Sequence, residues 1–282
     1  MRDVKILGMA TSLVEATSIV SPILSRRLVG ESAWVIDLEL SDLASDVLPG
    51  QFAMLSLAEG SPTLIPRPFS VYQYLGGKRY SFLVQKFGAG TACLVEAPIG
   101  TLLRCTLPLG NGFQVAEKNS EVVMVAGGVG SAPFLLYAQQ RCFLGASENT
   151  FMFYGGRTSG HLFDSKTFDE IGIPICYATD DGSVGYSGNV LDCLKQGLKD
   201  NVISKKALFL ACGPEGMLHA FAKWALEEGL NAFLSLETYM GCGYGVCNAC
   251  PVSTSSKGRY SNWPYVKTCT DGPVFDISDI KF

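Results

Sequence analysis

Three cysteines crowded into one glycine-rich loop, with a fourth further along, constrain this 282-residue chain more than any other feature. Cys242, Cys247 and Cys250 have the spacing C-x4-C-x2-C, and Cys269 follows after a short excursion. This spacing is typical of a [2Fe–2S] cluster, because two irons that share two sulfides need four thiolates that converge on a small volume. One tight loop can supply three of them, so the fourth must come from a segment that folds back. We therefore expect these four cysteines to ligate a [2Fe–2S] cluster.

The glycines of the same loop fit this interpretation. Gly241, Gly243 and Gly245 allow the backbone to take positive φ angles and to bring amide N–H groups close to sulfur. A four-cysteine zinc site and a pair of disulfides are the alternatives. Zinc sites usually pair two short C-x2-C knuckles, whereas this chain has one dense loop and a single distant cysteine, so the spacing disfavours zinc.

Composition sets bounds on the rest of the chain. Its 282 residues can form roughly two or three compact units, and 48% hydrophobic with 17% charged residues excludes a disordered chain. The formal net charge is −4 and no basic stripe is visible, so we expect no nucleic-acid partner. Ten cysteines without an evenly spaced framework favour a reducing compartment. We therefore expect a cytoplasmic protein.

The N-terminus carries a short apolar run over residues 6–14, flanked by Asp3 and Glu15. The run is too short to cross a bilayer, and no clean cleavage site for a signal peptide follows it. We interpret it as an N-terminal extension or as the first strand of the first domain. We expect no association with a membrane.

Residues 32 to about 113 have the pattern of closely spaced short strands. Residues 33–40 alternate in polarity, and residues 52–57 and 80–84 are further short runs rich in β-forming residues. No long helical period intervenes. Turn signals separate the runs, at Pro49-Gly50, Gly76-Gly77 and Gly110-Asn111-Gly112. The pattern predicts a small antiparallel barrel.

From about residue 121 the pattern changes to apolar strands that alternate with helical segments. The predicted strands are residues 122–126, 151–154, 173–178 and 207–211, and the predicted helices include residues 189–198 and 217–228. Such alternation indicates a parallel α/β sheet. We therefore expect a multi-domain chain with three parts: an antiparallel β-barrel domain at residues 1–115, an α/β parallel-sheet domain at 116–236 and a small C-terminal [2Fe–2S] domain at 237–282.

Two motifs of the barrel region can bind phosphate. In Arg67-Pro68-Phe69-Ser70, which we expect to close a strand, the arginine can pair with a diphosphate and the aromatic and hydroxyl side chains can flank a flat ring. In Gly88-Ala89-Gly90-Thr91, backbone amides and the Thr91 hydroxyl can form an anion-binding start to a short helix. Each motif alone also fits an ordinary turn or glycine loop. Together they predict a dinucleotide cofactor.

Two further motifs lie at one edge of the predicted parallel sheet. Gly127-Gly128-Val129-Gly130 stands between a buried strand and a helix, where glycines permit close approach and a helix N-terminus attracts phosphate. Cys212-Gly213-Pro214 ends a later strand at the same edge, where ligands bind in open α/β sheets. Cys212 can equally be a core residue, as we expect of the remaining cysteines, Cys93, Cys105, Cys142, Cys176 and Cys193.

The usual catalytic residues are scarce. His161 and His219 are the only histidines, and neither has a nucleophile or a ligand at a suitable spacing, so we expect both to be structural or solvated. Asp180-Asp181-Gly182 fits a plain turn as well as a loop near a cofactor. We therefore predict no acid–base or nucleophilic catalytic residue.

Taken in order, these motifs resemble the ferredoxin-reductase-like flavoproteins and, more narrowly, the electron-transfer subunits of bacterial and archaeal dihydroorotate dehydrogenase. The resemblance covers about residues 30–282 and includes Y-G-G-R at 154–157 and A-C-G-P-E-G-M at 211–217. It implies that FAD binds to Arg67, Pro68, Phe69, Ser70, Val84, Gln85, Lys86, Gly90 and Thr91. It implies that NAD binds at Gly127, Gly128, Gly130, Cys212, Gly213 and Pro214, and that Cys242, Cys247, Cys250 and Cys269 ligate the cluster.

The resemblance also implies an activity. It is that of an electron-transfer subunit in pyrimidine biosynthesis, in a hetero-oligomer with an FMN-containing dihydroorotate dehydrogenase subunit. Electrons would run from dihydroorotate through FMN, the cluster and FAD to NAD, while the protein supplies binding, orientation and tuning. The chain departs from the family pattern at Pro66, where a second arginine is common, and at Asn248, where glycine is common.

Two other functions stay open from the sequence. The chain can be the reductase subunit of another iron–sulfur oxidoreductase, such as a hydrogenase or a ferredoxin:NADP complex, and Arg157 can accept the 2′-phosphate of NADP. It can also be a zinc-stabilised interaction module without catalytic activity, which the cysteine spacing disfavours.

Overall fold

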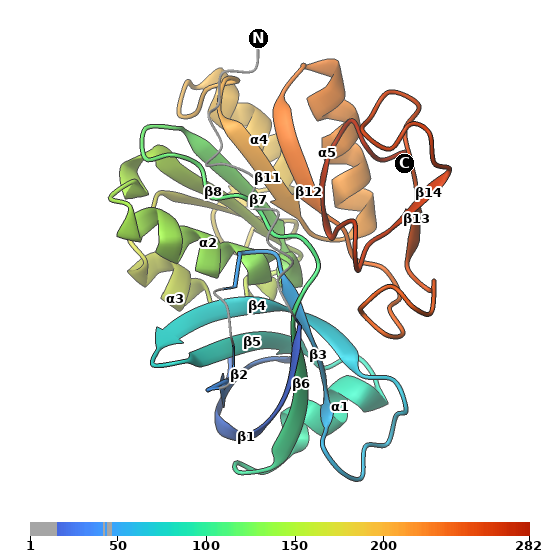
Figure 1. The fold of residues 1–282 in the computed structure, drawn as a ribbon. Coiled ribbons are helices and arrows are strands. Elements are labelled where there is room, and N and C mark those ends of the chain that lie inside the picture. Colours follow the sequence, from blue (N-terminus) through green and yellow to red (C-terminus); the bar gives the residue numbers. More distant parts are fainter. Residues whose placement is uncertain (1–15, 42, 44–46) are drawn as a thin grey trace.

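Six antiparallel strands close a barrel in the first part of the chain (Figure 1), in the order β1-β2-β5-β4-β3-β6. The computed structural model describes residues 16–41, 43 and 47–282, so the apolar run at 6–14 lies outside the described residues. The strands are β1 (Thr17–Leu28), β2 (Ala33–Glu39), β3 (Phe52–Leu57), β4 (Arg67–Gly76), β5 (Arg79–Gln85) and β6 (Leu102–Leu109), and the short helix α1 (Ala89–Glu96) follows β5. The predicted antiparallel barrel is confirmed.

The alternation predicted for β2 is present, and its reason is visible in the packing. Ile36 and Leu38 point into the barrel core, where they join Phe82 and Val84 of β5. The opposite face of β2 is also buried, because Val35 packs against the second domain. This part of the barrel wall is therefore covered on both sides.

One strand of the barrel was not predicted, and one expectation for the barrel is wrong. The segment before residue 30 contains β1, which pairs with both β2 and β6. Pro22 and the buried Ser21 interrupt the apolar alternation of β1 and hide the strand in the sequence.

Arg67-Pro68-Phe69-Ser70 opens β4 and does not close a strand. A proline is compatible with the first positions of a strand, where the missing N–H costs little.

The second domain is built on a seven-stranded sheet in the order β10-β9-β8-β7-β11-β12-β15. Six of these strands are parallel to one another: β7 (Val122–Gly127), β8 (Thr150–Gly156), β9 (Ile175–Thr179), β10 (Tyr186–Ser187), β11 (Leu208–Cys212) and β12 (Asn231–Ser235). The predicted parallel α/β sheet is confirmed.

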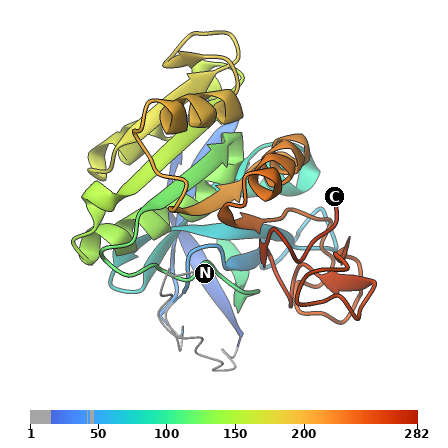
Figure 2. The same ribbon diagram turned by 90° about the horizontal axis from the view of Figure 1, so that it is seen from above.

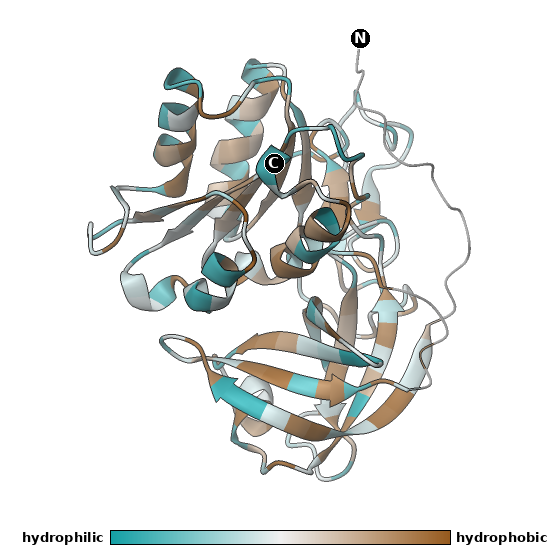
Figure 3. Ribbon diagram, turned by 90° about the vertical axis from the view of Figure 1, so that its left-hand side faces the viewer, coloured by the Kyte–Doolittle hydropathy of each residue, from teal (hydrophilic) through white to brown (hydrophobic). Residues whose placement is uncertain are grey.

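Helices cover both faces of this sheet. Val122, Met124 and Ala126 of β7 share one core with α2 (Ala132–Phe143) and α3 (Ser165–Glu170), and this core continues into the barrel wall. Val123 and Val125 share the other core with α4 (Val190–Lys199) and α5 (Glu215–Glu227). Figure 3 shows the apolar residues concentrated along these central strands. Among the described residues, no helix is long and apolar enough to cross a membrane.

The C-terminal segment packs beside α5 as a separate lobe (Figure 2). It contains the two-stranded sheet of β13 (Pro251–Ser253) and β14 (Tyr265–Lys267). Its last strand, β15 (Val274–Asp276), pairs antiparallel with β12. The lobe is thus joined to the nucleotide-binding sheet by a ladder of backbone hydrogen bonds, which the sequence did not lead us to expect.

Candidate functional site

The four cysteines of the C-terminal lobe converge as two pairs. The backbone N–H of Cys242 donates to the Sγ of Cys247 at 3.4 Å, and that of Cys247 donates to the Sγ of Cys242 at 3.5 Å. The Sγ atoms of Cys250 and Cys269 lie 3.2 Å apart. The hairpin of β13 and β14 explains the second pair, because pairing of Pro251 with Lys267 brings the flanking cysteines together.

The electrostatics of the site differ between its cysteines and favour a thiolate at Cys242. Burial acts to raise the pKa of Cys242, but hydrogen bonds from the backbone of Cys247, Tyr244 and Val246 outweigh it and lower the pKa to about 6. Burial together with the neighbouring Cys250 raises the pKa of Cys269 to about 12. The N–H groups that stabilise a thiolate here are the groups that would hydrogen-bond to the sulfurs of a cluster.

The donor set fits two irons better than one. In the described part of the chain, no three His, Cys, Asp or Glu side chains are arranged around the position of a single metal ion. Four thiols in two pairs instead match a cluster whose two irons each take two cysteines. Gly243 has φ 84° and Asn248 has φ 56°, so the loop needs residues that tolerate positive φ, and asparagine meets this need where the family often has glycine.

The cysteine loop rests directly on the barrel. A Cβ on Gly243 would lie 2.5 Å from Cγ of Met54 on β3. Phe52, Met54 and Leu109 form one apolar cluster with Cys250 and Cys269. The sequence did not single out Met54, because an apolar residue in a strand pattern gives no signal beyond core packing.

The barrel end next to this contact brings the two expected FAD motifs together. A Cβ on Gly90 would lie 2.8 Å from Nε of Arg67, so the arginine passes close over the first turn of α1. The Thr91 hydroxyl accepts the backbone N–H groups of Phe87, at 2.8 Å, and Gly88, at 3.1 Å, and so caps this helix. Pro68, Phe69 and Ser70 follow Arg67 along β4, opposite Met54, Ala53 and Phe52 of β3.

The other three residues expected to bind FAD lie at the end of β5. Val84 is buried in the barrel core, Gln85 is the last residue of the strand, and Lys86 pairs with Glu96 of α1. The side chain of Lys86 is therefore engaged at the surface. Strand β5 also contacts the turn Gly128–Ser131 of the second domain, which places the two expected nucleotide sites side by side.

The residues expected to bind NAD form two loops that touch each other. Gly127 lies against Met217 and Pro214, and a Cβ on Gly130 would overlap the backbone carbonyl of Cys212. These glycines permit the loops after β7 and β11 to pack together at the carboxyl edge of the sheet. Gly128 differs. It has φ 53°, and the atom nearest to a Cβ built on it, in the ring of Phe163, is 4.0 Å away. The space beside Gly128 can therefore accept a pyrophosphate.

The remaining residues singled out in the sequence have local partners. Burial raises the pKa of the Cys212 thiol to about 12, which leaves it neutral. His161 lies 2.6 Å from Arg157, and His219 stacks on the ring of Phe282. Asp181 accepts the backbone N–H and the hydroxyl of Ser183, as in a turn.

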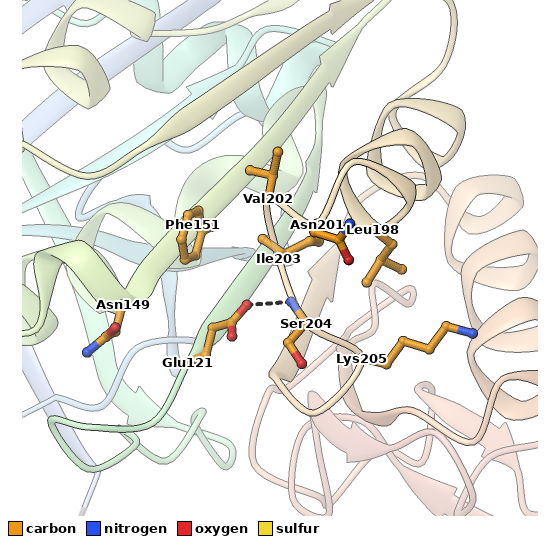
Figure 4. A pocket seen from close by; sticks show the side chains of 9 residues that line it. All are labelled: Glu121, Asn149, Phe151, Leu198, Asn201, Val202, Ile203, Ser204 and Lys205. Carbon is orange, nitrogen blue, oxygen red and sulfur yellow. Dashed lines mark hydrogen bonds between the residues drawn. The ribbon is translucent and has the colours of Figure 1, made fainter.

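A cavity of about 480 Å³ lies at the opposite edge of the sheet (Figure 4). Besides Leu198 of α4, its lining residues precede or begin strands, among them Glu121 before β7 and Phe151 in β8. The Glu121 carboxylate accepts the N–H of Ser204 at 2.7 Å. Ligands of open α/β sheets bind at the carboxyl ends of the strands, so this cavity at the amino ends is not part of the site.

Two family models match this chain, one over the C-terminal lobe and one over the domain with the parallel sheet. The family described as "Iron-sulfur cluster binding domain of dihydroorotate dehydrogenase B" matches residues 237–281, and "Oxidoreductase NAD-binding domain" matches residues 124–223. The electron transfer subunit of dihydroorotate dehydrogenase B (NAD(+)) from Geobacillus thermodenitrificans is 33% identical over 265 residues, covering 92% of this chain and 96% of the relative. The chain belongs to this family of electron transfer subunits. The relative from Clostridium acetobutylicum is 33% identical over 239 residues, covering 83% and 87%.

Solved structures agree with the fold described above. A chain of the NADH-dependent reduced ferredoxin-NADP oxidoreductase, described for flavin-based electron bifurcation, superposes with a TM-score of 0.78 and 26% identity over 93% of this chain and 89% of that one. A ferredoxin NADP+ reductase from Neisseria gonorrhoeae with bound FAD and NADP has a TM-score of 0.62 at 17% identity, over 76% and 93%. The family member described here is thus an oxidoreductase subunit with a ferredoxin-reductase-like fold.

Proposed function

We propose that this chain passes electrons between NAD and a partner dehydrogenase, and that the partner is an FMN-containing dihydroorotate dehydrogenase subunit with which it forms a hetero-oligomer. FAD and a [2Fe–2S] cluster would supply the redox chemistry, because a flavin can exchange both hydride and single electrons. The relatives are named as electron transfer subunits of dihydroorotate dehydrogenase B, which supports the choice of partner.

One observation carries the proposal: three candidate binding regions meet on adjacent strands of one barrel. The cysteine loop contacts Met54 of β3, the Arg67 motif opens the neighbouring β4, and β5 touches the Gly128 turn. The nucleotide region and the cluster region thus lie on either side of the FAD region. This order suits a chain whose residues bind and orient cofactors and take no part in acid–base chemistry.

Each group of residues has a defined task in this proposal. Arg67 and the first turn of α1 would hold the FAD diphosphate, and the open side of Gly128 would receive the pyrophosphate of NAD. The four cysteines would hold the cluster against the barrel, where Met54 and Leu109 exclude water from one side. The partner would approach the exposed side, where Cys247 and Tyr244 reach the surface.

A direct test is reconstitution with the dihydroorotate dehydrogenase catalytic subunit of the same organism. Dihydroorotate should then reduce NAD only when both chains are present.

A second candidate function, a reductase subunit of a ferredoxin:NADP-type complex, is favoured by the solved structure that covers 93% of this chain. In that case NADPH should reduce the flavin as fast as NADH, with Arg157 at the 2′-phosphate, and dihydroorotate should give no turnover.

A further inference from the structure

Asp164 is a buried carboxylate at the seam between the barrel and the nucleotide-binding domain. It directly precedes α3, has φ 54°, and its side chain is 4% exposed. Acidic side chains are rarely buried to this degree unless they are paired, and a non-glycine residue at this φ is uncommon. Both features indicate that the surrounding structure fixes Asp164 in place.

The contacts of this carboxylate cross the seam. It accepts two hydrogen bonds from Arg27 of β1, at 2.6 and 2.5 Å, and one from the Tyr72 hydroxyl of β4, at 2.7 Å. On its own side it accepts the hydroxyl of Thr167 at 2.8 Å. One carboxylate therefore joins two barrel strands to the second domain through charge-assisted bonds, which are the stronger kind.

The backbone around Asp164 reinforces the seam. The N–H of Asp164 donates to Val29 and the N–H of Glu31 donates to Gly160, both at 2.9 Å. Gly30 and Gly160 allow these two segments of the chain to approach each other, since a Cβ on Gly30 would lie 2.7 Å from the Gly160 carbonyl oxygen. The turn after β1 and the loop after β8 thus form a continuous contact.

The two segments that meet at Asp164 each adjoin a proposed cofactor site. Tyr72 is on β4, two residues beyond the end of the Arg67–Ser70 motif. Asp164 lies in the segment that runs on from Arg157 and from the carboxyl end of β8. The Tyr72 hydroxyl is fully buried, and burial and the Asp164 carboxylate both raise its pKa, so it stays a donor to that carboxylate.

We propose that Asp164 is a positioning residue that fixes the NAD-binding edge relative to the flavin-binding strand, and so sets the approach of nicotinamide to flavin. The inference rests on the proposed function. With FAD bound, the step it would affect is hydride transfer from NADH to the flavin, in which NADH would lose a proton with two electrons to become NAD+ and the flavin would be reduced. Asp164 touches neither reactant and acts through Tyr72 and Arg27.

The experiment is stopped-flow reduction of the bound flavin by NADH in the full-length holoprotein. Asp164→Asn keeps the shape and tolerates the positive φ but loses the charge, and Tyr72→Phe loses only the hydroxyl on the flavin strand. Misplacement by about 1 Å can slow a reaction by roughly a hundredfold, so we expect the limiting rate to fall by about 10- to 100-fold. The NADH concentration at half-saturation and the FAD content should not change. The double variant should fall no further than Asp164→Asn, because the two groups act as one unit.

Asp279→Asn is the matched control. Asp279 is also a buried carboxylate, 5% exposed and paired with Arg259, but both residues lie within the C-terminal lobe. Its variant should reduce flavin at the wild-type rate. The proposal is overturned if Asp164→Asn and Tyr72→Phe keep the wild-type limiting rate, or if Asp279→Asn slows it equally. Absence of flavin reduction in the wild type would instead overturn the proposed function, and this inference with it.

Discussion

The Sγ atoms of Cys250 and Cys269 lie 3.2 Å apart, although 19 positions separate the two residues in the sequence. A hairpin and a buried threonine create this proximity, since Thr268 donates both its backbone N–H and its hydroxyl to the carbonyl of Cys250. Backbone pairing at the base of the intervening excursion therefore holds the two thiols close together. The same pairing positions Cys269, the proposed fourth ligand, next to the cysteine loop.

Replacement of one cluster ligand should separate the two halves of the electron path. In Cys242→Ser the cluster should be lost, with about two irons and two sulfides per chain gone. Transfer of electrons from NADH to a dye through FAD should be largely kept, and partner-dependent turnover abolished. Cys176→Ser serves as the control, because Cys176 is a half-buried cysteine of β9 outside the cysteine loop. This variant should contain as much iron as the wild type. Loss of dye reduction with FAD still bound would contradict this layout.

A side chain at Gly90 should weaken FAD binding. Its Cβ position is 2.8 Å from the Arg67 guanidinium, so Gly90→Val must push the arginine away from the helix start. Overpacking typically costs about 1–3 kcal/mol, and a cost of this size on FAD binding corresponds to roughly 5- to 150-fold weaker affinity. Fluorescence of released FAD measures the effect. Gly216→Ala, in α5 with no atom near its Cβ position, should bind FAD normally. Equal affinity in Gly90→Val would remove Gly90 from the FAD site.

A side chain at Gly243 should disturb the seat of the cluster on the barrel. Gly243→Ala combines a positive φ with a Cβ only 2.5 Å from Met54, so the loop must shift away from β3. Reduction of the cluster after addition of NADH, followed by its absorbance or its paramagnetic signal, should slow while flavin reduction keeps its rate. Gly60→Ala has a similar backbone strain, φ 66°, but no neighbour, and it should behave as wild type. An unchanged cluster rate in Gly243→Ala would contradict the seating described above.

How far the sequence predicted these features depends on the range of the interactions. The spacing of Cys242, Cys247 and Cys250 is local, so the chemistry of the site could be inferred from it. The continuous apolar run at residues 122–126 likewise indicated a strand of a parallel sheet. Contacts such as Met54 with Gly243, or Asp164 with Tyr72, join residues far apart in the chain and involve side chains that leave no periodic signal. Strand β1 was missed because Ser21 and Pro22 break its alternation.

Stability at alkaline pH should depend on Tyr137. Burial raises its pKa to about 12, against about 10 in an unfolded chain. Between these values the unfolded chain loses the proton and the folded chain keeps it, so the free energy of unfolding falls as pH rises, by about 1.4 kcal/mol per unit. Urea unfolding at pH 9 and pH 11 should show a smaller fall in Tyr137→Phe than in the wild type. An equal fall in both proteins would contradict a contribution of the Tyr137 pKa to stability at alkaline pH.

The central claim, an internal path from NAD to the cluster, is tested most directly by one measurement. The protein is purified without oxygen, assayed for iron, sulfide, zinc and FAD, and its absorbance spectrum is recorded before and after addition of NADH. We predict about one FAD, two irons and two sulfides per chain, with both chromophores bleached by NADH. Zinc in place of iron, or a chain without flavin, would contradict the electron-transfer account and favour a zinc-stabilised interaction module.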